Sequence, residues 1–229
     1  MPYFFIDVYY WILVIPAVFV ALWAQVRVKS TFHRYNSVLN TKGLTAEMVA
    51  RQILDRNGLY SVRIERTPGS LSDHYDPRTN VVRLSDSTYG NTSVGALGVA
   101  AHEVGHALQY AVGYVPIKLR SAIIPISQIG SALSFPLILL GLIFSFPFFI
   151  NAGILLFSAV VLFQLVTLPV EFNASRRALK TLEDDQILET QELAGAKKVL
   201  SAAAMTYLAA VLVSLAQLLR LILLTNRRR

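Results

Sequence analysis

Four long apolar runs constrain this chain more than any other feature of its sequence. They cover residues 3–24, 122–146, 148–170 and 202–224. A helix that crosses a hydrocarbon core of about 30 Å needs roughly 20 apolar residues, and each run is at least that long. Hydrophobic residues make up 54% of the 229 residues, which is too many for an ordinary soluble domain or a disordered protein. We therefore expect a mainly α-helical, polytopic membrane protein with about four transmembrane helices.

The first run has the features of an uncleaved membrane anchor. Asp7 precedes its apolar core, and its basic residues, Arg27 and Lys29, follow the core. A cleaved signal peptide has the opposite order, with the positive charge first.

Charge near the ends of the runs predicts the orientation. The net charge is +7, and the basic residues lie beside the apolar runs, so we expect lipid headgroups and not nucleic acid as their partners. By the positive-inside rule, residues 25–121 and the polar segment after residue 170 are cytoplasmic, and the uncharged link at 145–151 faces outward. The tail at 227–229 disagrees if the fourth run crosses fully, so a re-entrant fourth helix remains an alternative. Arg220 lies near enough to that end to snorkel to the headgroups.

The long polar segment reads as a helix, a hairpin and a second helix. A helix is expected over residues 45–57, because apolar residues recur at helical spacing and Asn57-Gly58 ends the pattern. Short strands are expected at 62–66 and 81–84, with turn residues at 76–80 between them. The second helix, 93–112, is rich in Ala and Gly, which allows it to lie close to a neighbour.

That second helix carries the sequence His102-Glu103-Val104-Gly105-His106, which matches H-E-x-x-H. Residues four apart on a helix are separated by about one turn, so both imidazoles can meet one metal ion with Glu103 beside it. Burying two histidines and a glutamate on an apolar helix without partners is costly, which disfavours a purely structural role. The chain has no cysteine, so thiolate ligands are excluded.

A catalytic zinc ion usually has three protein ligands and one open position. His33 and His74 are the other histidines, so the third ligand is expected to be a carboxylate. We select Glu171, because it stands where the third apolar run meets the cytoplasm, and Pro169 can kink the helix just before it. The alternative is an interfacial glutamate paired with an arginine.

Four stretches of the chain resemble the bacterial membrane zinc metallopeptidases of the YugP type, and the resemblance covers nearly the whole chain. They are SDHYDP (72–77), VVRLS (81–85), VAAHEVGHALQ (99–109) and VEFNASRRA (170–178). The resemblance implies a zinc-dependent, membrane-embedded peptidase of the gluzincin kind, with His102, His106 and Glu171 as zinc ligands and Glu103 as the catalytic acid and base. Asp is common in this family where Asn173 stands, and more distant HtpX-like peptidases have Asp at the position of Ser175. We therefore expect Ser175 or Asn173 to give a zinc histidine a weaker hydrogen bond than a carboxylate would.

The apolar runs and the resemblance together predict five segments. These are an N-terminal transmembrane anchor (1–26), a cytoplasmic zincin-like domain with the hairpin and the HEVGH helix (27–121), a transmembrane hairpin (122–170), a cytoplasmic segment with the third zinc ligand (171–200), and a fourth transmembrane or re-entrant helix with a basic tail (201–229).

The predicted function is a Zn²⁺-dependent endopeptidase in the inner (plasma) membrane of a bacterium, acting near the cytoplasmic face on membrane-associated or unfolded proteins. A catalytically silent zinc-binding scaffold or chaperone is the alternative, against which Glu103 argues, because zinc binding alone needs no base. A transporter is disfavoured, since no acidic residue or histidine lies in the interior of an apolar run. Nothing in the sequence specifies an oligomeric state.

Three further features bear on the site. Strand 81–84 could offer its edge to an extended peptide substrate, and His74 and Tyr75 are candidate donors to the oxyanion that forms during hydrolysis. The acidic residues from Glu183 to Asp185, with Glu189 and Glu192, could be a second metal cluster but are expected to be the solvated face of a helix.

Overall fold

The computed structural model describes residues 7–226, and these form two compact units. One unit contains Val26–Ile117 and Pro169–Ala204. The other contains Lys118–Leu168 with the described parts of Met1–Gln25 and Met205–Arg229. The basic tail, residues 227–229, and the first residues of the first predicted span lie outside the described part of the chain.

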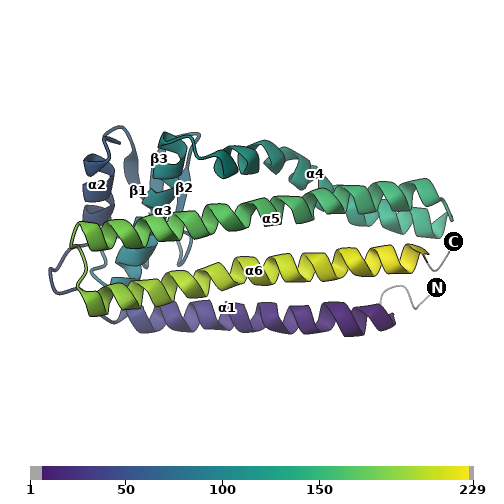
Figure 1. Ribbon diagram of the computed structural model, residues 1–229, viewed down its shortest axis with the longest axis horizontal. Coiled ribbons are helices and arrows are strands. Elements are labelled where there is room, and N and C mark those ends of the chain that lie inside the picture. The colour runs from purple at the N-terminus through teal and green to yellow at the C-terminus, as the bar shows by residue number, and fades with distance from the viewer. Residues whose placement is uncertain (1–6, 227–229) are drawn as a thin grey trace. The chain divides into compact units, whose positions relative to one another are not determined.

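Four long helices account for the apolar runs (Figure 1). A short π-helical segment, η2 (Tyr10–Val14), continues into α1 (Ile15–Asn36), and the other three helices are α4 (Val115–Ile143), α5 (Pro147–Asp184) and α6 (Thr190–Asn226). Within residues 7–226, these four have the length and apolar composition needed to cross a membrane. The four predicted spans are confirmed, and each helix except α4 also extends well into polar sequence.

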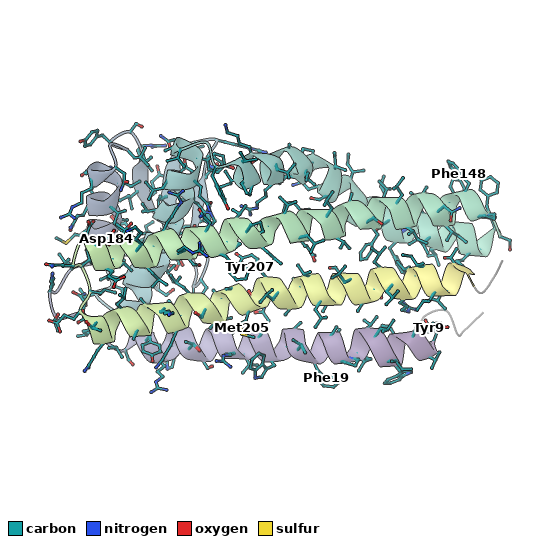
Figure 2. The ribbon with its side chains drawn as sticks, viewed as in Figure 1. Tyr9, Phe19, Phe148, Asp184, Met205 and Tyr207 are labelled. Carbon is teal, nitrogen blue, oxygen red and sulfur yellow. The ribbon has the colours of Figure 1, made fainter. Side chains whose placement is uncertain are left out.

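Large apolar side chains cover the outside of the unit that contains Lys118–Leu168, which we call the helical unit. Phe19 on α1 and Phe148 on α5 are each 67% exposed, and both point away from the neighbouring helices (Figure 2). Such side chains would be unfavourable in water and are suited to lipid. The exposure pattern therefore agrees with a membrane environment for these helices.

The predicted transmembrane hairpin, α4 and α5, packs through small residues. A Cβ atom on Gly130 would lie 2.6 Å from the carbonyl oxygen of Leu156, and one on Gly153 would lie 2.7 Å from that of Ser134. No side chain fits at these distances, so glycine allows the two backbones to approach each other.

Arg220 does not snorkel, and this expectation was wrong. Its side chain is 6% exposed and pairs with Asp7, whose Oδ2 lies 2.8 Å from Nε and 2.6 Å from Nη2 of the arginine. The guanidinium also lies over the ring of Tyr10, 5.1 Å from its centroid. A nearby carboxylate neutralises the charge within the protein, so the side chain has no need to reach the headgroups.

The unit that contains Val26–Ile117 and Pro169–Ala204 holds the predicted helix, hairpin and helix. Its elements are α2 (Ala46–Arg56), β1 (Arg63–Thr67), β2 (His74–Asp76), β3 (Val81–Ser85) and α3 (Val94–Ala111). The strand order is β1-β3-β2, with β1 parallel to β3 and β2 antiparallel to it. The two strands expected from the sequence therefore do not form the hairpin with each other. The hairpin joins β2 to β3, and the sequence did not reveal β2 because a strand of three residues is too short to show an alternation.

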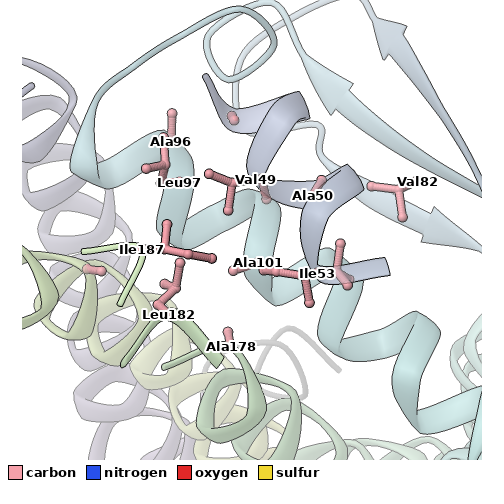
Figure 3. Close-up of a cluster of buried hydrophobic side chains, with 14 of the residues drawn as sticks. Val49, Ala50, Ile53, Val82, Ala96, Leu97, Ala101, Ala178, Leu182 and Ile187 are labelled. Carbon is pink, nitrogen blue, oxygen red and sulfur yellow. The ribbon is translucent and has the colours of Figure 1, made fainter. Parts of the chain in front are cut away.

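Helix α3 lies at the centre of the hydrophobic core of this unit (Figure 3). Leu97 and Ala101 of α3 belong to one cluster of buried side chains with Val49 and Ile53 of α2, Val82 of β3, Leu182 of α5 and Ile187, which follows α5. The apolar stripe of α2 faces this core, as its spacing predicts. The core holds α3 on several sides, so the chemistry on this helix is carried by a rigid element.

Candidate metal centre

Helix α3 begins and ends with defined caps. The Ser93 hydroxyl accepts a hydrogen bond from the backbone N–H of Ala96 at 3.1 Å, and Gly113 adopts a positive φ of 63° just after the helix. The predicted helix at 93–112 is thus confirmed. His102, Glu103 and His106 lie in the middle of this helix, and Glu103 and His106 are buried.

Glycine at position 105 lets α5 approach the histidines. A Cβ atom there would lie 2.7 Å from the carbonyl oxygen of Ala174, which is three residues after Glu171 on α5. Only a residue without a side chain can sit at this contact. The close approach places the turn of α5 that carries Glu171 against the turn of α3 that carries both imidazoles.

Three side chains meet at this contact. The Oε2 atom of Glu171 lies 3.3 Å from Nε2 of His102 and 3.6 Å from Nε2 of His106. The three candidate ligand atoms all lie within 4.8 Å of one another. In a tetrahedral zinc site with bonds of about 2.0–2.1 Å, neighbouring ligand atoms are separated by about 3.3 Å. The spacing of Glu171 from each histidine is therefore that of zinc ligands.

The Glu171 carboxylate supplies an independent test of whether a metal fits. Its side chain is 4% exposed, and its Oε2 atom is buried without a hydrogen-bond partner. A buried carboxylate oxygen that accepts no hydrogen bond is expensive, and the cost is offset when the oxygen binds a cation. The residues present fit a zinc ion.

Both histidines are oriented through their second ring nitrogen. The Ser175 hydroxyl lies 3.1 Å from Nδ1 of His102, and Oε1 of Gln109 lies 3.0 Å from Nδ1 of His106. In each ring the Nε2 atom is left to face Glu171. Hydrogen bonding of the non-ligating nitrogen is the usual way in which proteins fix a metal-binding imidazole. Ser175 fills the role expected of it, whereas Asn173 contacts Gln109 and not a histidine.

Burial and charge act in opposite directions on His106. Burial lowers the pKa of its imidazole, but the neighbouring carboxylates of Glu171 and Glu103 outweigh this and raise the pKa above its ordinary value. A metal ion at this site therefore competes with a proton for the imidazole.

Glu103 lies on α3 next to His102, one member of the trio formed by His102, His106 and Glu171. It is 8% exposed, and its Oε2 atom accepts a hydrogen bond of 3.0 Å from the backbone N–H of Tyr75 on β2. Because that N–H points to Glu103, it does not pair with β3. The carboxylate is thus held at the junction of α3 and the free edge of β2.

Known proteins with similar sequences decide the family. The family described as "Putative neutral zinc metallopeptidase" matches residues 10–226 of this chain. The chain belongs to this family. A relative from Bacillus subtilis (strain 168), named "Putative membrane protease YugP", is 48% identical over 212 residues, which cover 93% of this chain and 94% of the relative. No solved structure matches the chain. The expectations of a membrane metallopeptidase family and of a zinc cofactor are confirmed.

The strand edge of this metallopeptidase differs from the expected one. β3 is the central strand and pairs on both sides, so it has no free edge to offer, and that expectation was wrong. The edge that faces Glu103 belongs to β2. Sequence patterning marked β3 because it is the more apolar strand, and it is apolar because it is central and buried.

The two candidate oxyanion donors of the metallopeptidase lie next to each other on β2. His74 is exposed, with Nδ1 2.9 Å from the carbonyl oxygen of Ser72. The Tyr75 hydroxyl donates to Oδ1 of Asn80 at 2.9 Å and is thus engaged within the hairpin. Burial, with the nearby Tyr110 and Asp76, raises the pKa of Tyr75, so its phenol stays protonated.

The acidic run near the end of α5 in the metallopeptidase forms ion pairs and a helix cap. Asp184 pairs with Lys180 at 2.7 Å, and Asp185 pairs with Arg56. Glu192 accepts hydrogen bonds from the backbone N–H groups of Thr41 and Glu189. Among residues 7–226, the group of three or more side chains suited to a metal is the trio of His102, His106 and Glu171.

Proposed function

We propose that this membrane metallopeptidase is an endopeptidase that hydrolyses membrane-associated or unfolded proteins at the cytoplasmic face of the bacterial inner membrane. One observation carries the proposal. The buried and otherwise unpartnered Oε2 atom of Glu171 meets two imidazoles, and the Glu103 carboxylate lies on the same helix next to His102. This combination of a three-ligand site and an adjacent carboxylate is suited to hydrolysis.

His102, His106 and Glu171 would hold the zinc ion. Three protein ligands leave one position open, as a catalytic site requires. When bound, zinc polarises a peptide carbonyl and makes water acidic enough to release a proton near neutral pH. The two imidazoles would offer Nε2 to the ion, and the carboxylate of Glu171 would offset part of its charge.

Glu103 would move the proton. Its carboxylate takes a proton from the attacking water as the new C–O bond forms at the peptide carbonyl carbon. It then gives the proton to the peptide nitrogen as the C–N bond breaks, so the products are a carboxylate and an amine. The hydrogen bond from the N–H of Tyr75 holds this carboxylate in place between the two proton transfers.

The free edge of β2 would hold the substrate. An extended peptide can add to it by backbone hydrogen bonds, which is how many proteins bind unfolded segments without strong sequence preference. The N–H of Tyr75 on this edge is engaged by Glu103, so a peptide would pair with the carbonyl oxygen of Tyr75 and pass next to the proposed base. His74, one residue earlier, remains our proposed oxyanion donor, with its ring held by the 2.9 Å contact of Nδ1 with the carbonyl oxygen of Ser72.

The exchange of Glu103 for glutamine tests the proposed hydrolysis. Glu103→Gln removes the base but keeps the shape, so we expect loss of cleavage of an unfolded model substrate with zinc still bound. Glu192→Gln is the matched control, because Glu192 is similarly buried, at 9% exposure, in the same unit but caps α6. Turnover that persists in Glu103→Gln overturns the proposed mechanism. Zinc binding without any turnover by the wild type favours a silent scaffold.

The absence of cysteine makes the proposed orientation directly measurable. A single cysteine is introduced either at the exposed Ser61, near β1, or at the exposed Asn151, at the start of α5. In intact cells, we expect a membrane-impermeant maleimide to label Asn151→Cys and to spare Ser61→Cys until the membrane is permeabilised. The reverse pattern overturns the cytoplasmic placement.

A further inference from the structure

Gln109 is the most completely buried polar side chain next to the metal centre, and nothing in the H-E-x-x-H pattern assigns it a role. It lies on α3 one turn after His106 and has no exposed surface. Its amide makes three hydrogen bonds, to Nδ1 of His106, to the carbonyl oxygen of Val170 and to Oδ1 of Asn173. One side chain thus contacts a proposed metal ligand on α3 and the backbone of α5 directly before Glu171.

The direction of these hydrogen bonds follows from chemistry. A backbone carbonyl oxygen can only accept, so the NH₂ group of Gln109 must be the atom that faces Val170, at 2.8 Å. The amide oxygen is then the atom that faces His106, at 3.0 Å. Because this oxygen has no proton, Nδ1 of His106 must carry one. The Nε2 atom of the neutral ring is left with its lone pair facing Glu171.

Two residues of α5 support the same assignment. An arginine Nε–H can only donate, so the 2.8 Å contact from Arg177 identifies the facing atom of Asn173 as its oxygen. That oxygen then accepts the second N–H of Gln109, at 3.0 Å. Arg177 therefore fixes the orientation of Asn173, Asn173 and Val170 fix that of Gln109, and Gln109 fixes the tautomer of His106.

We propose that Gln109 is the positioning residue of the metal centre, which holds His106 in the tautomer that binds zinc through Nε2 and ties it to the turn of α5 that carries Glu171. The inference rests on the proposed metal site. Gln109 does not touch the substrate or the reacting atoms. Its amide oxygen takes the place of the carboxylate that often orients a zinc histidine. Its NH₂ group adds a link from α3 to α5.

The experiment compares three variants of the full-length protein in detergent. Gln109→Leu removes all three hydrogen bonds at similar volume, and Gln109→Glu keeps an acceptor for Nδ1–H of His106. Asn40→Leu is the matched control, because Asn40 is also a buried amide, at 5% exposure, and bonds to the carbonyl oxygens of Leu44 and Thr92 away from the trio. Zinc affinity is measured by competition with a chromophoric chelator, and thermal unfolding is measured without metal.

We expect Gln109→Leu to weaken zinc binding by about 10–100-fold, the usual range for loss of a residue that orients a metal ligand. Gln109→Glu should recover at least half of that loss on a logarithmic scale. Asn40→Leu should lower the unfolding temperature as much as Gln109→Leu does but leave zinc affinity within about twofold. Wild-type zinc affinity in Gln109→Leu overturns the proposal, as does an equal loss in Gln109→Leu and Asn40→Leu.

A spectroscopic readout addresses the tautomer itself. In zinc-loaded protein labelled with ¹⁵N-histidine, the His106 ring should show a protonated Nδ1 and a Nε2 without a proton. Comparison of metal-free wild type with metal-free His106→Gln identifies its signals, which are then followed as zinc is added. A ring protonated at Nε2 overturns the assignment. His106→Gln also separates the two proposals. If it keeps zinc, the metal site is wrong, whereas if it loses zinc while Gln109→Leu keeps full affinity, only the role of Gln109 is wrong.

Discussion

Gly105→Ala is the substitution whose effect follows most directly from the geometry of the site. The added methyl group would lie 2.7 Å from the carbonyl oxygen of Ala174 and 3.3 Å from its Cα and carbonyl carbon. Ordinary contacts begin about 0.7 Å further out than the first of these distances. The clash is with backbone, which has no rotamer to change, so α3 and α5 must move apart.

Two magnitudes decide the outcome. Overpacking of this kind costs about 1–3 kcal/mol, and alanine recovers up to about 1 kcal/mol through its helix propensity, so the protein should still fold. Ligand positions, however, tolerate only about 0.5 Å of displacement. Ala174 is three residues from Glu171, so most of the shift reaches the third ligand. We expect zinc affinity to fall at least about tenfold, or about 1.4 kcal/mol.

Chelator competition and peptidase assays measure the effect of Gly105→Ala. Gly98→Ala is the control on the same helix, because its methyl group would meet the Ala196 side chain of α6 at 3.2 Å, away from the ligands. This variant should keep wild-type zinc affinity. If Gly105→Ala also keeps wild-type zinc affinity and activity, then the close approach of α3 to α5 does not set the ligand geometry.

Three other predictions concern the ion pair of the helical unit, the His102 hydrogen bond and pH. Asp7→Asn should lower the free energy of unfolding by about 3–5 kcal/mol in thermal scans, because it removes the carboxylate that neutralises the buried Arg220. The more exposed Arg51–Asp55 pair is the control, and Asp55→Asn should lower this free energy by less than about 1 kcal/mol. Ser175→Ala should weaken zinc binding by about tenfold in a chelator titration, and unchanged affinity would show that its hydrogen bond to His102 is dispensable. Burial lowers the pKa of His106, but Glu171 and Glu103 outweigh it and raise this pKa, so a proton outcompetes zinc as the pH falls through it. Calorimetry should detect proton release on zinc binding and a weaker zinc affinity at pH 6 than at pH 8. A zinc affinity that does not depend on pH would contradict this coupling.

The features predicted well from the sequence were those that depend on local spacing. The apolar runs define the four long helices, and the separation of His102 from His106 puts both on one face of α3. Glu171 could be selected because the predicted membrane topology limits which carboxylates can reach that face. In each case the prediction depends on spacing within one helix or on the predicted direction in which the chain crosses the bilayer.

The features that were missed depend on pairing between distant positions. Asp7 and Arg220 are 213 residues apart, and neither residue indicates the other. Gln109 carries a weak signal, one turn after His106, but only the arrival of Val170 and Asn173 shows which way its amide points. The parallel pairing of β1 with β3 depends on β2 occupying the other edge, and β2 is too short to be read from its pattern.

The most direct test of the central claim is the zinc content of Glu171→Ala, measured after purification in detergent beside the wild type and Glu103→Gln. The proposed roles predict one zinc ion per chain in the wild type and in Glu103→Gln, and a content well below one in Glu171→Ala. A full zinc complement in Glu171→Ala would contradict the claim that α3 and α5 together form the metal centre.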